Sequence, residues 1–266
     1  MDEEYKGKKI VESSASILGG VTGSIVGTWI AGPGAGTFAG AVAGTSIGEV
    51  VKRGIGEFAN RFLSSREQLR IESAAKYAVI KIKQLREEGC IPRADNFFDN
   101  DETDRSSADE IFEGVLLKAK NEHQEKKIRY LGNLFANVAF RSDVSVPEAN
   151  YLLKTAEELS YRQFCFIALL NQKGVLNIES LRRREHTTRD LQILRREEWT
   201  LHAPSFGVYG LIDGNNAWED WLNDLGDNFY ELLGLSEIPQ KDIDELSHLI
   251  NLCDSSPLPS RGANRR

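Results

Sequence analysis

The stretch at residues 32–48, GPGAGTFAGAVAGTSIG, places a glycine at every fourth position and contains no charged side chain. The glycines of this ladder are Gly32, Gly36, Gly40, Gly44 and Gly48, and an earlier ladder at the same spacing holds Gly19, Gly23 and Gly27. Residues four apart lie along one face of a helix, so small residues at this spacing let two backbones approach closely. Because glycine costs about 1 kcal/mol relative to alanine inside a helix, we expect the ladders to be helix-packing or oligomerisation surfaces.

Both ladders lie in an uncharged run from Ser13 to Gly48. The run has about 36 residues, nearly twice what one helix needs to cross a bilayer. Gly32-Pro33-Gly34 stands at its middle, and this combination is a strong turn signal. The pattern therefore predicts a helical hairpin with arms at about residues 13–30 and 36–51. Each arm would be roughly 24–27 Å long, slightly short of a hydrocarbon core of about 30 Å.

Cations flank this hairpin on one side only. Lys6, Lys8 and Lys9 precede the first arm, Lys52 and Arg53 follow the second, and the tip is uncharged. By the positive-inside rule, both ends of the chain then stay in the cytoplasm, and Trp29 lies beside the tip where an interfacial aromatic would be placed. The sequence thus predicts a membrane hairpin at residues 1–53 with these side chains at the membrane surface. A secretory signal peptide and a soluble hairpin buried against the rest of the chain remain as alternatives.

The two ladders around a Gly-Pro-Gly turn resemble the glycine-zipper hairpins of bacterial membrane proteins, among them pore-forming or membrane-disrupting effectors of abortive-infection defence. The resemblance covers residues 13–53. It implies a segment that oligomerises in the membrane. From it we expect an effector that a sensor protein releases to permeabilise or depolarise the inner membrane. The partners expected on this basis are membrane lipid, further copies of the chain and a sensor or regulatory protein.

The composition of the whole chain sets the remaining limits. The 266 residues carry a net charge of -7, which argues against a protein that coats nucleic acid through bulk electrostatics. The three cysteines, Cys90, Cys165 and Cys253, are far apart, so a disulfide framework or a metal knuckle is not expected and a reducing cytoplasm fits. We expect the protein to rest in the cytoplasm, at the inner membrane, or in both places.

Residues 54–159 are predicted to form a helical bundle, which makes the fold mainly α. Apolar residues recur at helical spacing in 66–88 and again from residue 108 onward. An acidic loop at residues 92–106 interrupts the helices, and Ser107–Glu110 has the pattern of a capping box that starts the next one. The loop imitates a calcium loop only in part, because Asp104 stands where the sharp-turn glycine belongs. We therefore interpret it as a solvated loop, and a docking surface and a repulsive guard over the hairpin stay open as alternatives.

Residues 160–253 show a different pattern of predicted secondary structure. A capping box at Ser160–Gln163 starts a helix to about residue 171, and further helices are predicted near 178–184 and 187–198. Two β-prone runs follow, Trp199–Ala203 and Phe206–Ile212, and a closing helix is predicted from Trp218 to Leu233. This order resembles a winged-helix domain. Residues 254–266 are rich in Pro, Ser and Arg and are predicted to be a disordered tail.

Arginines gather on the second and third predicted helices of this winged-helix-like region: Arg182, Arg183, Arg184, Arg189, Arg195 and Arg196. Such cations on a third helix would contact phosphates in a DNA-binding domain. Five acidic residues are interleaved with them, namely Glu179, Glu185, Asp190, Glu197 and Glu198. We therefore expect a protein-binding or structural surface, and nucleic acid is not the expected partner.

No motif in the sequence points to catalysis. The four histidines are scattered, none at a metal-binding spacing with another, and no nucleophile elbow or phosphate loop is present. We therefore expect no enzyme, no cofactor and no metal site. The first alternative to the membrane effector is a membrane-tethered winged-helix regulator or adaptor that binds DNA or protein. A further alternative is a soluble assembly protein whose ladders pack protein on protein.

Overall fold

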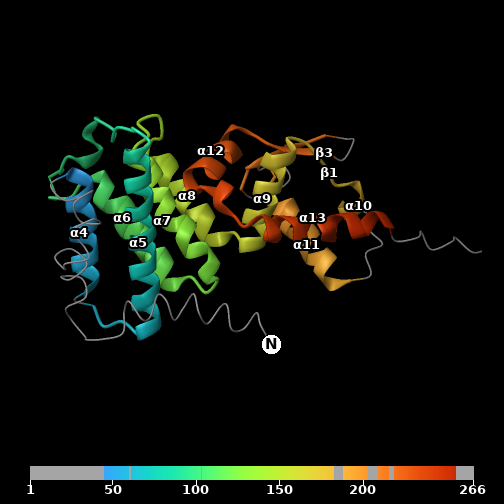
Figure 1. The fold of residues 1–266 in the computed structure, drawn as a ribbon, viewed down its shortest axis with the longest axis horizontal. Helices are drawn as coiled ribbons and strands as arrows, with labels where there is room; N and C mark the ends of the chain where they lie inside the picture. The colour runs from blue at the N-terminus through green and yellow to red at the C-terminus, as the bar shows by residue number, and fades with distance from the viewer. Residues whose placement is uncertain are drawn as a thin grey trace, which may run out of the picture.

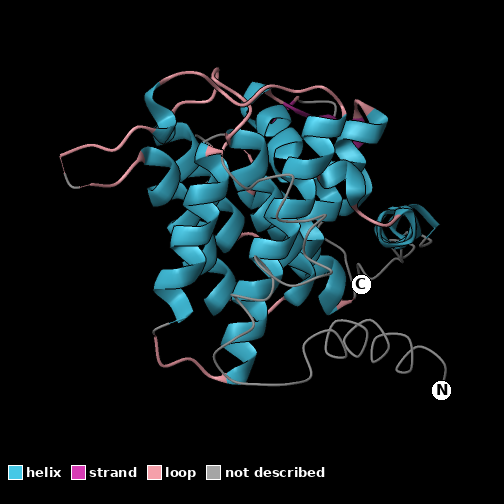
Figure 2. Cartoon of the chain, turned by 60° about the vertical axis from the view of Figure 1, so that its left-hand side comes forward, coloured by secondary structure: helices cyan, strands magenta, loops and turns pink. Residues whose placement is uncertain are grey.

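A computed structural model describes residues 45–59, 61–102, 104–182, 188–202, 209–215 and 219–255. Helices dominate these ranges and the strands are short, which confirms the predicted mainly α class (Figure 1, Figure 2). The predicted first arm, the turn and most of the second arm lie outside the described residues. So do the ladder glycines from Gly19 to Gly44, the cations Lys6, Lys8 and Lys9, Trp29, and the predicted tail after residue 255.

Five helices form the first part of the molecule, at the left of Figure 1. They are α4 (Ser46–Ala59), α5 (Ser65–Glu87), α6 (Ser107–Asn121), α7 (Ile128–Val138) and α8 (Val146–Glu158), with short 3-10 turns at Asn96–Phe98 and Glu125–Lys127. Helix α7 packs against α5, α6 and α8, so it lies at the centre of this bundle. Serine side chains cap α5, α6 and α8, and α6 begins one residue earlier than predicted, with Ser106 and Asp109 forming its capping box.

Helix α4 contains the last residues of the predicted hairpin, and it packs within the bundle. Ile47, Val50 and Phe58 are buried in the core, although the sequence placed the first two on a membrane arm. Arg53, predicted at the membrane surface, has its Nη1 atom 2.7 Å from the buried carboxylate of Asp109 on α6. Lys52 is exposed and Gly48 is half-buried. Helix α4 is therefore held in place by contacts with the bundle.

The prediction of a transmembrane helix is wrong for the part of the chain that the structure describes. Across these residues no helix is both long enough and apolar enough to pass through a bilayer. Helix α4, which contains the end of the predicted second arm, is 14 residues long and carries charges at both ends and in its middle. The expectation of a pore-forming effector in antiviral defence is corrected with it, because no described element supplies the membrane-spanning helix on which it depended.

The second part of the molecule combines helices with a small sheet. It contains α9 (Tyr161–Lys173), β1 (Leu176–Asn177), α10 (Glu179–Arg182), α11 (Arg189–Thr200), β2 (Ile212–Gly214), β3 (Glu219–Leu222), α12 (Asp224–Leu233) and α13 (Gln240–Ser255). Strand β3 lies between β1 and β2, and both pairings are antiparallel. Leu176 faces Asp220 across one ladder, and Asp213 faces Trp221 across the other.

Several boundaries in this part differ from the predicted ones. Trp199 and Thr200 continue α11 instead of starting a strand, because the Thr200 hydroxyl bonds within the helix to the Glu197 carbonyl and accepts a bond from Gln163 on α9. Residues 219–222 form β3, although a helix was predicted from residue 218. The capping box at Ser160 and Gln163 is confirmed.

The two parts are joined by polar contacts between α7 and α12. The side-chain amide of Asn137 donates to the Leu232 carbonyl at 2.8 Å, and that of Asn133 donates to the Leu233 carbonyl at 3.2 Å. These carbonyls belong to the last turn of α12, where helical partners are missing. Helix α12 ends at Gly234, whose φ of 65° is left-handed. The central helix of the bundle thus caps the end of a helix in the second part.

Candidate functional site

Helix α11 is anchored on one face and exposed on the other. Leu194 and Glu198 are its buried residues, and they lie one turn apart against the rest of the second part. The opposite face, called here the outer face of α11, consists of Arg189, Gln192, Ile193, Arg196 and Trp199. These positions follow the spacing of a single helical stripe. Ile193 is 49% exposed and Trp199 is 47% exposed, so this face presents two large apolar side chains to solvent.

The fold separates charges that are interleaved in the sequence. Glu198 points inward and is fully buried. Glu197 is held at the side of the helix, where it accepts hydrogen bonds from the Ser160 hydroxyl at 2.7 Å and from Arg162 at 2.5 Å. Asp190 is exposed beside the stripe, and Glu185 lies outside the described residues. The outer face of α11 therefore carries two arginines and no carboxylate, although the segment as a whole is nearly neutral.

The six arginines predicted as one surface are divided by the structure. Arg189 and Arg196 are exposed on the outer face of α11, and Arg195 is half-buried at its side. Arg182, at the end of α10, turns inward and its side chain is only 11% exposed. Arg183 and Arg184 lie outside the described residues. Of the four predicted arginines that the structure describes, Arg189 and Arg196 are therefore the two exposed cations on α11.

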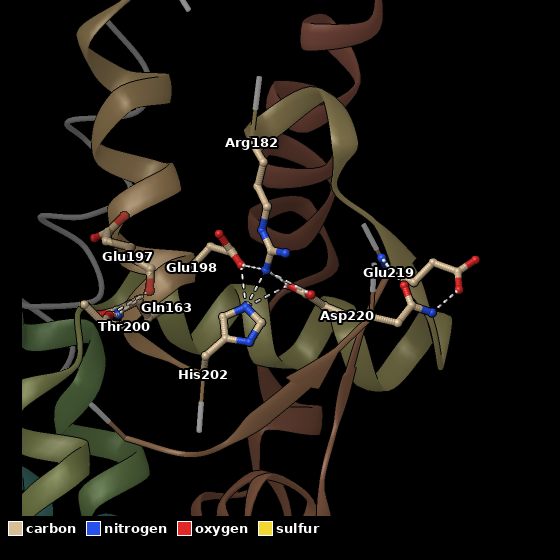
Figure 3. A network of polar contacts seen from close by, with 9 residues as sticks. Gln163, Arg182, Glu197, Glu198, Thr200, His202, Glu219 and Asp220 are labelled. Atoms are coloured by element: carbon tan, nitrogen blue, oxygen red, sulfur yellow. Dashed lines mark hydrogen bonds and ion pairs between the residues drawn. The ribbon is translucent and has the colours of Figure 1, made fainter. Parts of the chain in front are cut away.

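A buried group of four charged side chains lies beneath the end of α11 (Figure 3). It consists of Arg182 from α10, Glu198 from α11, His202 just after α11 and Asp220 from β3, and is called here the charged cluster. Arg182 Nη2 lies 2.5 Å from Glu198 Oε1 and 3.1 Å from Asp220 Oδ1. His202 Nε2 lies 2.7 Å from Glu198 Oε1 and 3.5 Å from Asp220 Oδ2. The cluster ties three separate segments together.

Burial and the attraction between opposite charges shift the pKa values of His202 and Glu198 in opposite directions. Burial alone would lower the pKa of His202, but its contacts with Asp220 and Glu198 raise that pKa to about 9. Burial would raise the pKa of Glu198, but hydrogen bonds from His202 and Arg182 lower it below its usual range. Burial raises the pKa of Asp220, and the nearby Glu198 charge adds to this rise. The four groups are therefore electrostatically dependent on one another.

The charged cluster is in contact with the outer face of α11 through Trp199. The guanidinium carbon of Arg182 lies 5.7 Å from the centroid of the Trp199 ring. The ring centroids of Trp199 and His202 are 6.1 Å apart. On the other side of the helix, Gln163 donates to the Glu197 carbonyl at 2.9 Å. The end of α11, and with it the position of Trp199, is thus set by buried polar contacts on both sides.

Sequence reasoning missed the charged cluster. The one available signal was the spacing of Glu198 and His202, which are four residues apart at the end of a predicted helix. Asp220 gave no signal, because it lay within a predicted helix and its pairing in the sheet depends on residues far away in the chain. Glu198, His202 and Asp220 are also the one group, among the residues that the structure describes, whose ligand atoms are close enough to hold a metal ion.

Comparisons with known proteins returned no relative. No family model matches the chain, no curated protein matches it, and no solved structure matches it. The resemblance of residues 13–53 to glycine-zipper hairpins therefore stays a prediction.

Proposed function

We propose that this chain is an adaptor or regulatory protein whose second part is a winged-helix module that binds another protein. The order α9, β1, α10, α11, β2 and β3, with β3 between the other two strands, is that of a winged helix, and this order supports the assignment. In such modules α11 is the helix that meets the partner. The observation that carries the proposal is the outer face of α11, with its exposed Ile193 and Trp199.

The residues on this face favour a protein partner. Tryptophan and arginine are enriched where protein interfaces gain most of their binding energy, and exposed apolar side chains together with them mark contact surfaces. Ile193 and Trp199 supply the apolar area, while Arg189 and Arg196 supply positive charge. The complementary partner is a protein surface with an apolar centre and acidic residues around it.

The wing argues against nucleic acid as the partner. In this assignment the strands β2 and β3 belong to the wing, and the sequence of residues 203–223 contains no lysine or arginine. Asp213 and Glu219 are partly exposed in its strands. A DNA-binding wing contacts phosphates, for which it needs cations. With a net charge of -7 for the chain as well, the balance of charge supports a protein contact.

In the proposed adaptor, the glycine ladders are the segment through which the chain associates with itself. Their spacing along residues 15–48 is that of close helix contacts, so they serve to join copies of the chain. An adaptor of this kind assembles through its N-terminal segment and recruits a regulatory protein through α11. Gly40→Leu together with Gly44→Leu should lower the mass of the assembly in light-scattering chromatography. An unchanged mass would remove self-association through the ladder from the proposal and leave the α11 contact in place.

Site-specific photo-crosslinking in cells tests the α11 contact. A photoreactive phenylalanine at Ile193 should form a discrete adduct with another protein. The matched control is the same probe at Ile91, which is 80% exposed in the loop after α5. We expect no comparable adduct there. Equal adducts at the two positions, or none at Ile193, would contradict the proposal.

The competing nucleic-acid function is tested with purified full-length protein and a fluorescent DNA duplex. We expect no anisotropy change at low salt, where nonspecific binding is strongest. Binding that weakens steeply with salt and disappears on combining Arg189→Glu with Arg196→Glu would instead identify α11 as a DNA-contacting helix.

A further inference from the structure

Three potential metal ligands converge in the charged cluster. Glu198, His202 and Asp220 each offer one ligand atom, these atoms all lie within 4.8 Å of one another, and all three residues are buried. Glu198 and His202 are four residues apart at the end of α11, a spacing that puts two ligands on one side of a helix. Asp220 comes from β3 and completes the set from another segment.

The contacts of His202 leave a conflict that a bound cation would remove. His202 Nε2 lies 2.5 Å from Arg182 Nη2 and 2.7 Å from Glu198 Oε1. If Nε2 carries a proton, it faces a guanidinium that can only donate. If Nε2 carries no proton, it faces a carboxylate that, when ionised, can only accept. Either state leaves one unfavourable contact, whereas a metal ion accepts the lone pairs of nitrogen and oxygen together.

The unsatisfied carboxylate of Glu198 is a second observation that favours a bound cation. Its side chain is fully buried, and its Oε2 atom has no hydrogen-bond partner. Buried carboxylate oxygens are normally satisfied by donors or by coordination to a metal. Gly214 brings the backbone of β2 against the same group, since a Cβ there would lie 2.6 Å from Asp220 Oδ1. The cluster thus has the backbone of β2 close to Asp220 and a carboxylate oxygen of Glu198 that is not satisfied.

We propose that Glu198, His202 and Asp220 bind a divalent transition-metal ion of the zinc class. One imidazole and two carboxylates match the ligands of Zn²⁺, which takes four ligands, whereas Ca²⁺ takes six to eight oxygens. Arg182 Nη2 contacts Glu198 Oε1, His202 Nε2 and Asp220 Oδ1, so metal binding requires the guanidinium to move away from these atoms. The metal clamps the end of α11 to β3 beneath Trp199. Metal binding itself does not depend on the proposed protein contact.

Zinc binding is measured on the full-length protein after removal of metal with a chelator. Competition with a chromophoric chelator should give one tightly bound Zn²⁺ per chain. Co²⁺ bound instead of Zn²⁺ should give the visible absorption bands of a metal site with a low coordination number. His202→Ala and Glu198→Gln should each weaken zinc binding by at least tenfold. The matched control is His123→Ala, which removes a histidine whose side chain is 84% exposed, and it should bind as the wild type does.

A second variant keeps the test decisive if the ligand variants fold poorly. Arg182→Met removes the competing cation but keeps all three ligands, so it should bind Zn²⁺ more tightly than the wild type and gain thermal stability when Zn²⁺ is added. The proposal would be overturned if neither the wild type nor Arg182→Met bound Zn²⁺. The cluster would then be purely ionic. Binding that persists equally in His202→Ala and Glu198→Gln would overturn it too.

Discussion

At the scale of single residues, the close approach of α5 and α7 in the bundle depends on Gly132. A Cβ at Gly132 on α7 would lie 2.4 Å from the Ala74 carbonyl on α5. Ala74 and Ala78, one helical turn apart on α5, are completely buried at the same crossing. Small residues four apart do let two helices approach closely in this protein, and here they do so inside the core. The glycine ladders lie in a different segment, so this contact was not predicted.

Gly132→Ala should destabilise the protein, because the added methyl group overlaps the α5 backbone. We expect a loss of roughly 1–3 kcal/mol in the free energy of unfolding, measured by urea denaturation. Gly56→Ala is the matched control, since a Cβ at Gly56 on α4 meets nothing within 4 Å. That change should be neutral or stabilise by up to about 1 kcal/mol. Equal effects of the two changes would show that α5 and α7 are not this close.

The cysteines Cys90 and Cys165 should differ strongly in reactivity. Burial raises the pKa of Cys165 to about 11, whereas Cys90 is exposed. A thiolate is the reactive species, so at pH 8 a thiol reagent should label Cys90 quickly and Cys165 only after unfolding. Peptide mass spectrometry at timed intervals distinguishes the two sites. Labelling of both at similar rates in the folded protein would contradict the placement of Cys165 in the core.

At the scale of elements, Glu113 on α6 holds two neighbouring segments in place. It accepts a bond from Arg61, in the link between α4 and α5, at 2.9 Å, and one from Arg105, in the acidic loop, at 2.7 Å. The bond from Arg105 is the main reason that the pKa of Glu113 lies below its usual value. The acidic loop is therefore attached to the bundle by an arginine at its end, which composition alone did not indicate.

Glu113→Gln should reduce stability in a pH-dependent way. A carboxyl group with a lowered pKa in the folded state stabilises the protein above its unfolded pKa of about 4.3, and this contribution is lost as pH falls through the folded value. The variant should thus be less stable than the wild type at pH 7, and the difference should shrink below about pH 4. Urea denaturation at several pH values measures it. Glu102→Gln, an exposed change in the same loop, should show no such trend.

How far the elements were predictable depends on how local their causes are. The capping box at Ser160 was found because its contacts lie within four residues, and that at Ser106 was missed by one residue because Ser107 stands beside it. The strands β1 and β3 were missed because pairing between distant segments creates them. The sequence likewise predicted an arginine surface on two neighbouring helices of the second part. Only the fold shows that Arg182 and Glu198 turn inward.

At the scale of the whole molecule, two asparagines connect the bundle to the second part. Asn133 and Asn137 donate from α7 to carbonyls in the last turn of α12. Glu237, just after α12, pairs with Lys81 on α5 at 3.2 Å and with Arg129 on α7 at 2.5 Å. Because Asn133 and Asn137 are buried at this joint, we expect the two parts to unfold together in the wild type.

Replacing both Asn133 and Asn137 by alanine should weaken this coupling. The α12 carbonyls would lose their donors, which costs roughly 1–3 kcal/mol for each buried group left unsatisfied. Calorimetry should show a lower melting temperature and a broader or divided transition. Asn150→Ala is the control, because Asn150 donates only to an exposed carboxylate, that of Glu110. A single unaltered transition in the double variant would show that the joint does not depend on these amides.

The central claim is that the outer face of α11 binds a protein partner, and the most direct measurement is the crosslink from Ile193 with and without Arg196. The probe at Ile193 is compared in the otherwise unchanged chain and in the chain that carries Arg196→Glu. Arg196 lies one turn from Ile193 on the exposed stripe, so reversing its charge should repel an acidic partner without touching the core. We predict that the protein adduct is lost in the variant. An adduct of undiminished yield would contradict the claim.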